Sequence, residues 1–148
     1  MKRQLNFEVL HSTEYLERLQ QEGILKLNNI GAEKTATYHD PCHLGRGQAI
    51  YEAPRRIIDA IKGIELKELS RSRENSLCCG GGGLVPIGFP EFSDDLAQER
   101  ALEMKNQGAE LLLSACPACK ENLKIAAKKL KLRTKVVDIA ELVNDALK

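Results

Sequence analysis

Five cysteines are the residues of this chain whose type and spacing could do chemistry. Cys116 and Cys119 form a Cys-Pro-Ala-Cys motif, Cys78 and Cys79 are adjacent, and Cys42 stands alone. Thirty-five residues separate Cys42 from Cys78, and 36 separate Cys79 from Cys116. Cysteines bind metals, exchange disulfides or pair with each other, so their surroundings decide which reaction they serve.

The chain shows signs of a reducing compartment. The opening Met1-Lys-Arg-Gln-Leu5 lacks the apolar core of a signal peptide, and no apolar run approaches the roughly 20 residues that cross a bilayer. We therefore expect a cytoplasmic protein, in which structural disulfides are rare. Five is also an odd number, so the cysteines cannot all pair. Metal ligation or redox chemistry is favoured.

Composition excludes other classes of function. With 148 residues the chain has the usual size of one domain. Lys and Arg number 22 against 21 acidic residues, so the net charge of +1 gives no electrostatic footprint for nucleic acid or an acidic membrane. Aromatic residues make up only 4%, and Trp is absent, which disfavours base-stacking platforms.

Hydrophobic periodicity and turn residues predict strands that alternate with helices. Strands are expected at residues 35–39, 65–69, 110–115 and 135–138. Helices are expected at residues 7–22, 54–63, 91–107, 117–130 and 139–147. Residues 75–90 contain four successive glycines and two prolines, a composition that predicts a loop without regular structure. The alternation predicts an α/β fold with a mostly parallel sheet flanked by helices.

The predicted strands bring distant cysteines together. Cys42 follows the strand at 35–39, and Cys116 follows the strand at 110–115. Open α/β sheets place their ligands beyond the carboxyl ends of parallel strands. We therefore expect the cysteines to gather beyond the carboxyl ends of the strands. There, Pro117 would open a helix whose positive end stabilises thiolates.

The adjacent cysteines bear on the choice of metal. Cys78 and Cys79 cannot easily bind one tetrahedral zinc together, and a structural zinc needs only four ligands. A multi-iron cluster presents several metal atoms and can use all five thiolates, which favours iron–sulfur. Two alternatives stay open. One is a zinc-binding structural or interaction domain with a spare cysteine, and the other is a dithiol oxidoreductase in which Cys116 attacks and Cys119 resolves.

Residues beside the cysteines are candidates for supporting a cluster. His39, His43 and Arg46 flank Cys42, and could bind metal, donate hydrogen bonds or balance the charge of an anionic cluster, as could Asp40. Gly80 and Gly81 would let the backbone approach a cluster and point N–H groups at its sulfurs. The glycines match neither a dinucleotide fingerprint nor a Walker loop. His11 has no such neighbours, and we assign it no role.

Three segments carry a family resemblance. Thr37-Tyr-His-Asp-Pro-Cys-His-Leu-Gly-Arg46, Cys78-Cys-Gly-Gly-Gly82 and Cys116-Pro-Ala-Cys119 resemble the motifs of the cysteine-rich CCG domain. Such domains occur in the B and D subunits of heterodisulfide reductase, the glycolate oxidase iron–sulfur subunit, lactate utilisation protein A and the C subunit of the anaerobic glycerol-3-phosphate dehydrogenase. The resemblance covers about residues 35–143 and departs from the family pattern nowhere.

The resemblance implies an electron-transfer domain of an iron–sulfur oxidoreductase that is not catalytically complete alone. Family members carry four-iron clusters, including noncubane ones, through cysteines that correspond here to Cys42, Cys78, Cys79, Cys116 and Cys119. Some modules hold zinc instead. The implied partners are a second iron–sulfur module or a flavoprotein dehydrogenase subunit, which could hold the chain at the inner face of a membrane.

The resemblance also sets expected domain boundaries. We expect an N-terminal helix and linker at 1–34 and the CCG domain at 35–148. Family members usually have two such modules, often behind a ferredoxin-like domain, whereas this chain has one. It is therefore expected to be the C-terminal part of a longer oxidoreductase.

Overall fold

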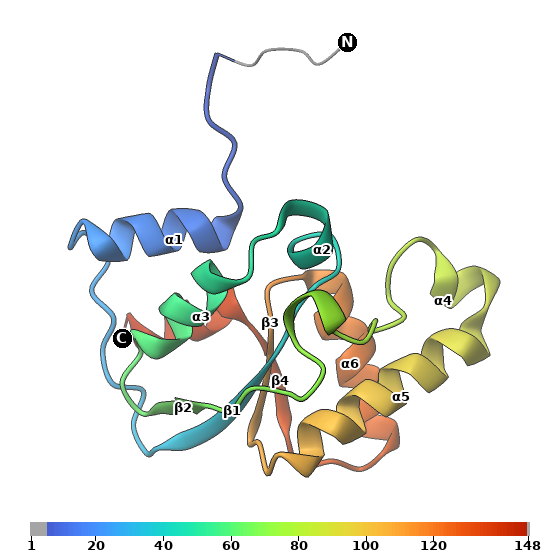
Figure 1. Ribbon diagram of the computed structural model, residues 1–148. Helices are drawn as coiled ribbons and strands as arrows, with labels where there is room; N and C mark the ends of the chain where they lie inside the picture. The colour runs from blue at the N-terminus through green and yellow to red at the C-terminus, as the bar shows by residue number, and fades with distance from the viewer. Residues whose placement is uncertain (1–5, 148) are drawn as a thin grey trace.

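Four parallel strands form one sheet between two layers of helices in the computed structural model, which describes residues 6–147 (Figure 1). The strand order is β2-β1-β3-β4, so the chain crosses from one edge to the other. This architecture confirms the α/β fold with a parallel sheet that the sequence predicts.

The elements follow in the expected alternating order. In chain order they are α1 (Ser12–Gln21), β1 (Lys34–His39), α2 (Gly45–Gln48), α3 (Glu52–Asp59), β2 (Ile64–Leu66), a 3-10 turn (Arg73–Asn75), α4 (Val85–Gly88), α5 (Pro90–Asn106), β3 (Leu111–Ser114), α6 (Pro117–Lys129), β4 (Lys135–Asp138) and α7 (Ile139–Ala146). The four predicted strands are all present, although β2 is shorter than expected because only residues 64–66 pair with β1.

The two faces of the sheet support different layers. Successive residues of a strand point to opposite faces. Leu111 and Leu113 accordingly pack on one face with side chains of α3 and α7, whereas Leu112 packs on the other with Met104 of α5 and Leu123 of α6. Figure 1 shows the same division, with α1, α3 and α7 on one side of the sheet and α5 and α6 on the other. The core clusters therefore hold the central strands from both sides.

Helix α1 begins later than the predicted residue 7. It starts at Ser12 because His11 closes its first turn: the His11 Nδ1 accepts from the Thr13 N–H, and the Glu14 carboxylate accepts from the His11 N–H. Phe7 lies outside the helix and is exposed. His11, to which the sequence assigned no role, is thus the N-terminal cap of this helix.

The predicted loop at 75–90 is wrong in its second half. Residues Val85–Gly88 form one helical turn, α4, and α5 starts at Pro90. Two local features permit this turn. Leu84 adopts a left-handed φ of 60°, which redirects the chain, and Pro86 occupies the first turn, where its missing N–H costs nothing. Phe92, which the helical pattern grouped with the apolar residues of α5, is exposed.

Within residues 6–147, no helix combines the length and the apolar content needed to cross a bilayer.

The buried centre of β3 should dominate stability. Replacing Leu112 by Ala leaves a cavity between the sheet and helices α5 and α6. We expect a loss of about 2–5 kcal/mol in the free energy of unfolding. Urea unfolding measures this loss. The matched control Leu102→Ala alters a leucine that is 39% exposed and should cost far less. Equal losses for the two variants would contradict the assigned packing.

Candidate functional site

The carboxyl ends of β1 and β3 bring Cys42 and Cys116 to one edge of the sheet. The parallel pairing of these strands sets His39 opposite Ser114, so both strands end side by side. Cys42 lies in the turn after β1, and Cys116 is the N-cap of α6 with Pro117 as the first helical residue. The expected convergence beyond the strand ends is therefore present.

Side chains of α5 and α6 hold the segment with the adjacent cysteines in place. The Asn122 amide donates to the carbonyl oxygen of Cys79 at 2.6 Å and to the Ser93 Oγ at 3.2 Å. The Ser93 hydroxyl in turn donates to the carbonyl oxygen of Gly80 at 2.8 Å. These bonds satisfy the buried backbone and fix the Cys79–Gly80 peptide against both helices.

The glycines after Cys79 allow this close approach. Gly80 has a left-handed φ of 73°, and a Cβ on Gly81 would lie 2.8 Å from the Ala118 carbonyl oxygen. The backbone N–H of Gly80 donates to the Cys78 Sγ at 3.3 Å, and that of Gly81 donates to the Cys79 Sγ at 3.4 Å. The glycines therefore point N–H groups at sulfur atoms, as their composition suggested.

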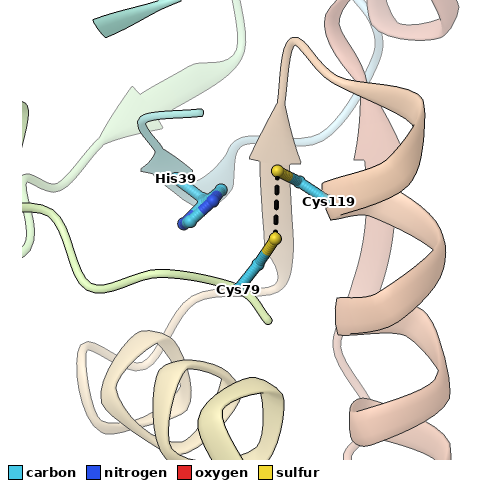
Figure 2. A group of neighbouring side chains, drawn as sticks. All are labelled: His39, Cys79 and Cys119. Atoms are coloured by element: carbon cyan, nitrogen blue, oxygen red, sulfur yellow. Dashed lines mark hydrogen bonds between the residues drawn. The ribbon is translucent and has the colours of Figure 1, made fainter. Parts of the chain in front are cut away.

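All five cysteines line one cavity of about 1010 Å³. They are Cys42, Cys78, Cys79, Cys116 and Cys119. Cys79 and Cys119 are buried, and the other three are half-buried. The Sγ atoms of Cys79 and Cys119 lie 3.1 Å apart, at hydrogen-bond distance (Figure 2). Three remote parts of the chain thus deliver soft sulfur donors to one hollow whose other lining is mostly apolar.

Close sulfur atoms perturb each other's titration. Hydrogen bonding to Cys119 lowers the pKa of Cys116 to about 6, and the N–H groups of Cys119 and Ala118 at the start of α6 assist. The pKa of Cys79 is also lowered, chiefly by the hydrogen bond with Cys119 and further by His39. The pKa of Cys119 is raised, because its proton is shared with both neighbouring thiolates. Two thiolates around one retained proton are a ready set of ligands for a cation.

The histidines near Cys42 lie in different places. His39 is buried, and one of its ring nitrogens lies within 4.8 Å of the Sγ atoms of Cys79 and Cys119 (Figure 2). His43 is exposed at the edge of the same cavity. The structure therefore brings His39 to the sulfur atoms, while a role for His43 stays a prediction.

Arg46 and Asp40 bind parts of the framework. The Arg46 guanidinium donates to the carbonyl oxygens of Glu74 and Ser76, at 3.1 and 2.7 Å, and so holds the segment that leads to Cys78. The Asp40 carboxylate is buried and accepts two bonds from Arg55, at 2.7 and 3.0 Å. Arg46 as the counter-charge of a cluster stays a prediction, and Asp40 is already paired.

Three residues of the site escape sequence reasoning: Ser93, Arg100 and Asn122. Each lies on a helix and contacts the cysteine segment or His39 through a side-chain hydrogen bond. One signal was available, because Arg100 occupies a position in the helical repeat that also holds Ala97, Ala101 and Met104. A charged residue on the buried stripe of a helix needs a buried partner, and here a partner is His39.

Comparison with a family model finds a match over residues 36–124 to the cysteine-rich domain called CCG. This range includes all five cysteines.

Curated relatives carry iron–sulfur or redox descriptions. The chain is 41% identical over 144 residues to the D subunit of dihydromethanophenazine:CoB–CoM heterodisulfide reductase from Methanosarcina acetivorans, covering 97% of this chain and 35% of that protein. It is 37% identical to a probable membrane-anchored ferredoxin of Chromohalobacter salexigens, covering 96% of this chain and 21% of that protein. It is 35% identical to a probable iron–sulfur-binding oxidoreductase of Bacillus subtilis, covering 92% of this chain and 19% of that protein. The chain thus spans about a third, or less, of the length of these relatives.

The tight contact at Gly81 leads to a prediction. Gly81→Ala forces a Cβ against the Ala118 carbonyl and should lower the free energy of unfolding by about 1–3 kcal/mol. It should also expose the Cys79 thiol to alkylation, because the loop must move. Urea unfolding and mass spectrometry of the alkylated protein measure both effects. Gly82→Ala is the control, since nothing lies within 4 Å of a Cβ there; a similar effect of both variants would refute the close contact.

The lowered pKa of Cys116 leads to a second prediction. Thiolate is the reactive form, and its fraction rises with pH, so alkylation of Cys116 in the reduced, metal-free protein should reach half its maximal rate near pH 6. An unperturbed cysteine would do so at about pH 8.5. Cys119→Ala removes the hydrogen-bond donor and should move the midpoint upward. A wild-type midpoint at the unperturbed value would disprove the assigned interaction.

Proposed function

This chain belongs to the family of cysteine-rich CCG domains, and from this premise we propose that it is an iron–sulfur cluster-binding electron-transfer module of an oxidoreductase. The observation that carries the proposal is the single cavity lined by all five cysteines of the chain. The electron-transfer role agrees with the names of the relatives, which include a reductase, a ferredoxin and an iron–sulfur-binding oxidoreductase.

The donor set fits a cluster. Thiolates are the usual ligands of iron–sulfur clusters, and backbone N–H groups directed at sulfur tune them. Here the N–H groups of Gly80 and Gly81 already bond to the sulfur atoms of Cys78 and Cys79. The contact between Gly81 and Ala118 leaves no room for a side chain on that wall. Soft donors, directed N–H groups and a mostly apolar lining together support iron and sulfide.

We further propose a four-iron cluster of noncubane type, with Cys42, Cys78, Cys79, Cys116 and Cys119 as its ligands. A cubane four-iron cluster needs only four cysteines, and so does a structural zinc, whereas the cavity is lined by five. Adjacent cysteines suit a cluster in which they bind different irons. The five-thiol count therefore favours an arrangement with more protein ligands than a cubane.

The protein's own residues would hold and shield this group. When bound, a cluster supplies reversible one-electron chemistry. Asn122 and Ser93 keep the Cys79–Gly80 peptide in place. Apolar side chains such as Leu44, Leu96 and Val85 line the same cavity and limit its contact with water. The lowered pKa of Cys116 keeps this ligand ionised at neutral pH, so that a metal need not displace its proton.

We propose that the electrons come from, or pass to, another iron–sulfur module or a flavoprotein subunit. One cluster alone has no second centre along which electrons could move. The relative in Methanosarcina acetivorans is named as a subunit, and another is named as membrane-anchored. A partner could therefore hold this chain in the cytoplasm at the inner face of a membrane.

Zinc is a second candidate that one observation favours. His39, Cys79 and Cys119 offer ligand atoms that all lie within 4.8 Å of one another, and Cys116, which is hydrogen-bonded to Cys119, could complete a tetrahedral set. In that case the site would be structural, and Cys42 and Cys78 would be spare. The dithiol alternative depends on the lowered pKa of Cys116 beside Cys119.

Anaerobic purification with analysis of iron, acid-labile sulfide and zinc tests the proposal. We expect about four irons and their sulfide per chain, with an electron paramagnetic resonance signal in one redox state. Cys42→Ala should lose most of the iron and the colour, while the surface control Lys128→Gln should retain both. Stoichiometric zinc without iron or sulfide, unchanged by Cys42→Ala, would establish the zinc candidate. Rapid disulfide exchange without any bound metal would establish the dithiol oxidoreductase.

A further inference from the structure

Arg100 is a charged residue in the centre of the protein. Its side chain on α5 is fully buried. The guanidinium donates to the Arg71 carbonyl oxygen at 2.9 Å, the Glu103 carboxylate at 2.8 Å and the Ser76 Oγ at 3.1 Å. Its fourth bond, from Nε, goes to the Nδ1 of His39 at 3.1 Å. Burying a guanidinium is costly, so each of these bonds is needed to offset the loss of water.

The contact between Arg100 and His39 determines where the imidazole carries its proton. A guanidinium has only N–H donors and cannot accept a hydrogen bond. The Nδ1 of His39 must therefore be the acceptor and carry no proton. A neutral imidazole protonated at one nitrogen then has its hydrogen on Nε2.

Because Nδ1 accepts from Arg100, Nε2 is the ring nitrogen of His39 that remains available to the cysteines. His39 ends β1, and Figure 2 shows its ring beside the sulfur atoms of Cys79 and Cys119. A ring nitrogen lies within 4.8 Å of both sulfur atoms, and Nδ1 is engaged by Arg100. The Nε2–H is thus available as a donor to sulfur, and its lone pair is not available to a metal.

We propose that Arg100 is a positioning residue that holds His39 in the Nε2–H form, so that His39 donates a hydrogen bond to the sulfur of Cys79 and does not ligate metal. The effect on a cluster rests on the proposed function, whereas the protonation of His39 does not. A hydrogen bond to a ligand sulfur stabilises the more negative, reduced state and raises the reduction potential. Arg100 would therefore influence the potential through His39.

Nitrogen-15 NMR of the histidines in the reduced, metal-free protein tests the first half. The chain has three histidines, and His39→Gln assigns the signal of His39 by its loss. We expect wild-type His39 to show an unprotonated Nδ1 and a protonated Nε2. Arg100→Met should give a mixture of the two neutral forms. An Nδ1–H form or an imidazolium in the wild-type protein would overturn the proposal, and this measurement needs no substitution at Arg100.

The reduction potential of the iron-loaded protein tests the second half. His39→Leu and Arg100→Met should each shift the potential downward, and the double variant should shift it no further than His39→Leu does. His39→Gln should restore most of the value, because its amide N–H can take the place of Nε2–H. Arg71→Met is the control, since it removes a nearby cation that bonds to Glu103 without contacting His39.

The remaining outcomes of these two experiments each decide a different part of the proposal. If Arg100→Met does not fold, Arg100→Met combined with Glu103→Gln also neutralises the half-buried carboxylate that has lost Arg100 as a partner, and repeats the test. An unchanged potential in His39→Leu would overturn the effect on the cluster. If the protein takes up no iron, the proposed function fails, while the NMR result still decides the role of Arg100. Metal-bound Nε2 in a zinc-loaded protein would overturn the proposal as a whole.

Discussion

The parallel pairing of β1 with β3 is the interaction on which the rest of the site depends. It sets His39 beside Ser114, so that the chain leaves both strands at one edge and carries Cys42 and the Cys116 motif to the same place. The pairing is held by core residues on both faces of the sheet, with Leu113 on one face and Leu112 on the other. Two cysteine segments separated by more than seventy positions, from Cys42 to Cys116, are thereby neighbours.

A buried polar network joins the third cysteine segment to this edge. Asp40 binds Arg55 through both carboxylate oxygens and also accepts from the backbone N–H of Arg73 at 2.8 Å. Arg100 binds Ser76 and His39. These bonds connect the end of β1 with the residues just before Cys78. A buried ion pair contributes little net stability, but removing one partner is costly, so such a network favours one arrangement of the loop.

The sulfur atoms themselves are in an arrangement that calls for a positive partner. Cys116 and Cys79 have lowered pKa values, and both depend on hydrogen bonding to Cys119. The N–H group of Gly81 and those at the start of α6 also lower the pKa values of Cys79 and Cys116 respectively. Membership of the CCG family and the iron–sulfur descriptions of relatives agree with this chemistry. The framework thus collects the sulfur atoms of five cysteines around one mostly apolar cavity.

Much of the fold was readable from local pattern. Strand-forming residues at 35–39 and 110–115, with prolines and glycines between elements, predicted the alternating α/β order, because those signals lie within each segment. The convergence of Cys42 and Cys116 followed from that order, because parallel strands end at the same edge of a sheet. The start of α1 and the turn α4 were missed, since they depend on a cap by His11 and on a left-handed φ at Leu84. Backbone conformation of that kind leaves little trace in composition.

The amino-acid sequence by itself determined which residues could bind metal, through the number and spacing of the cysteines, and it identified the family. Only the tertiary structure decided what surrounds them. The contact between Arg100 and His39 spans 61 positions, and that between Asn122 and Cys79 spans 43. Such pairs arise from helix packing across a sheet, a three-dimensional property that periodicity cannot express. The identity of the candidate ligands is therefore a property of the sequence, whereas the hydrogen bonds around them are set by packing.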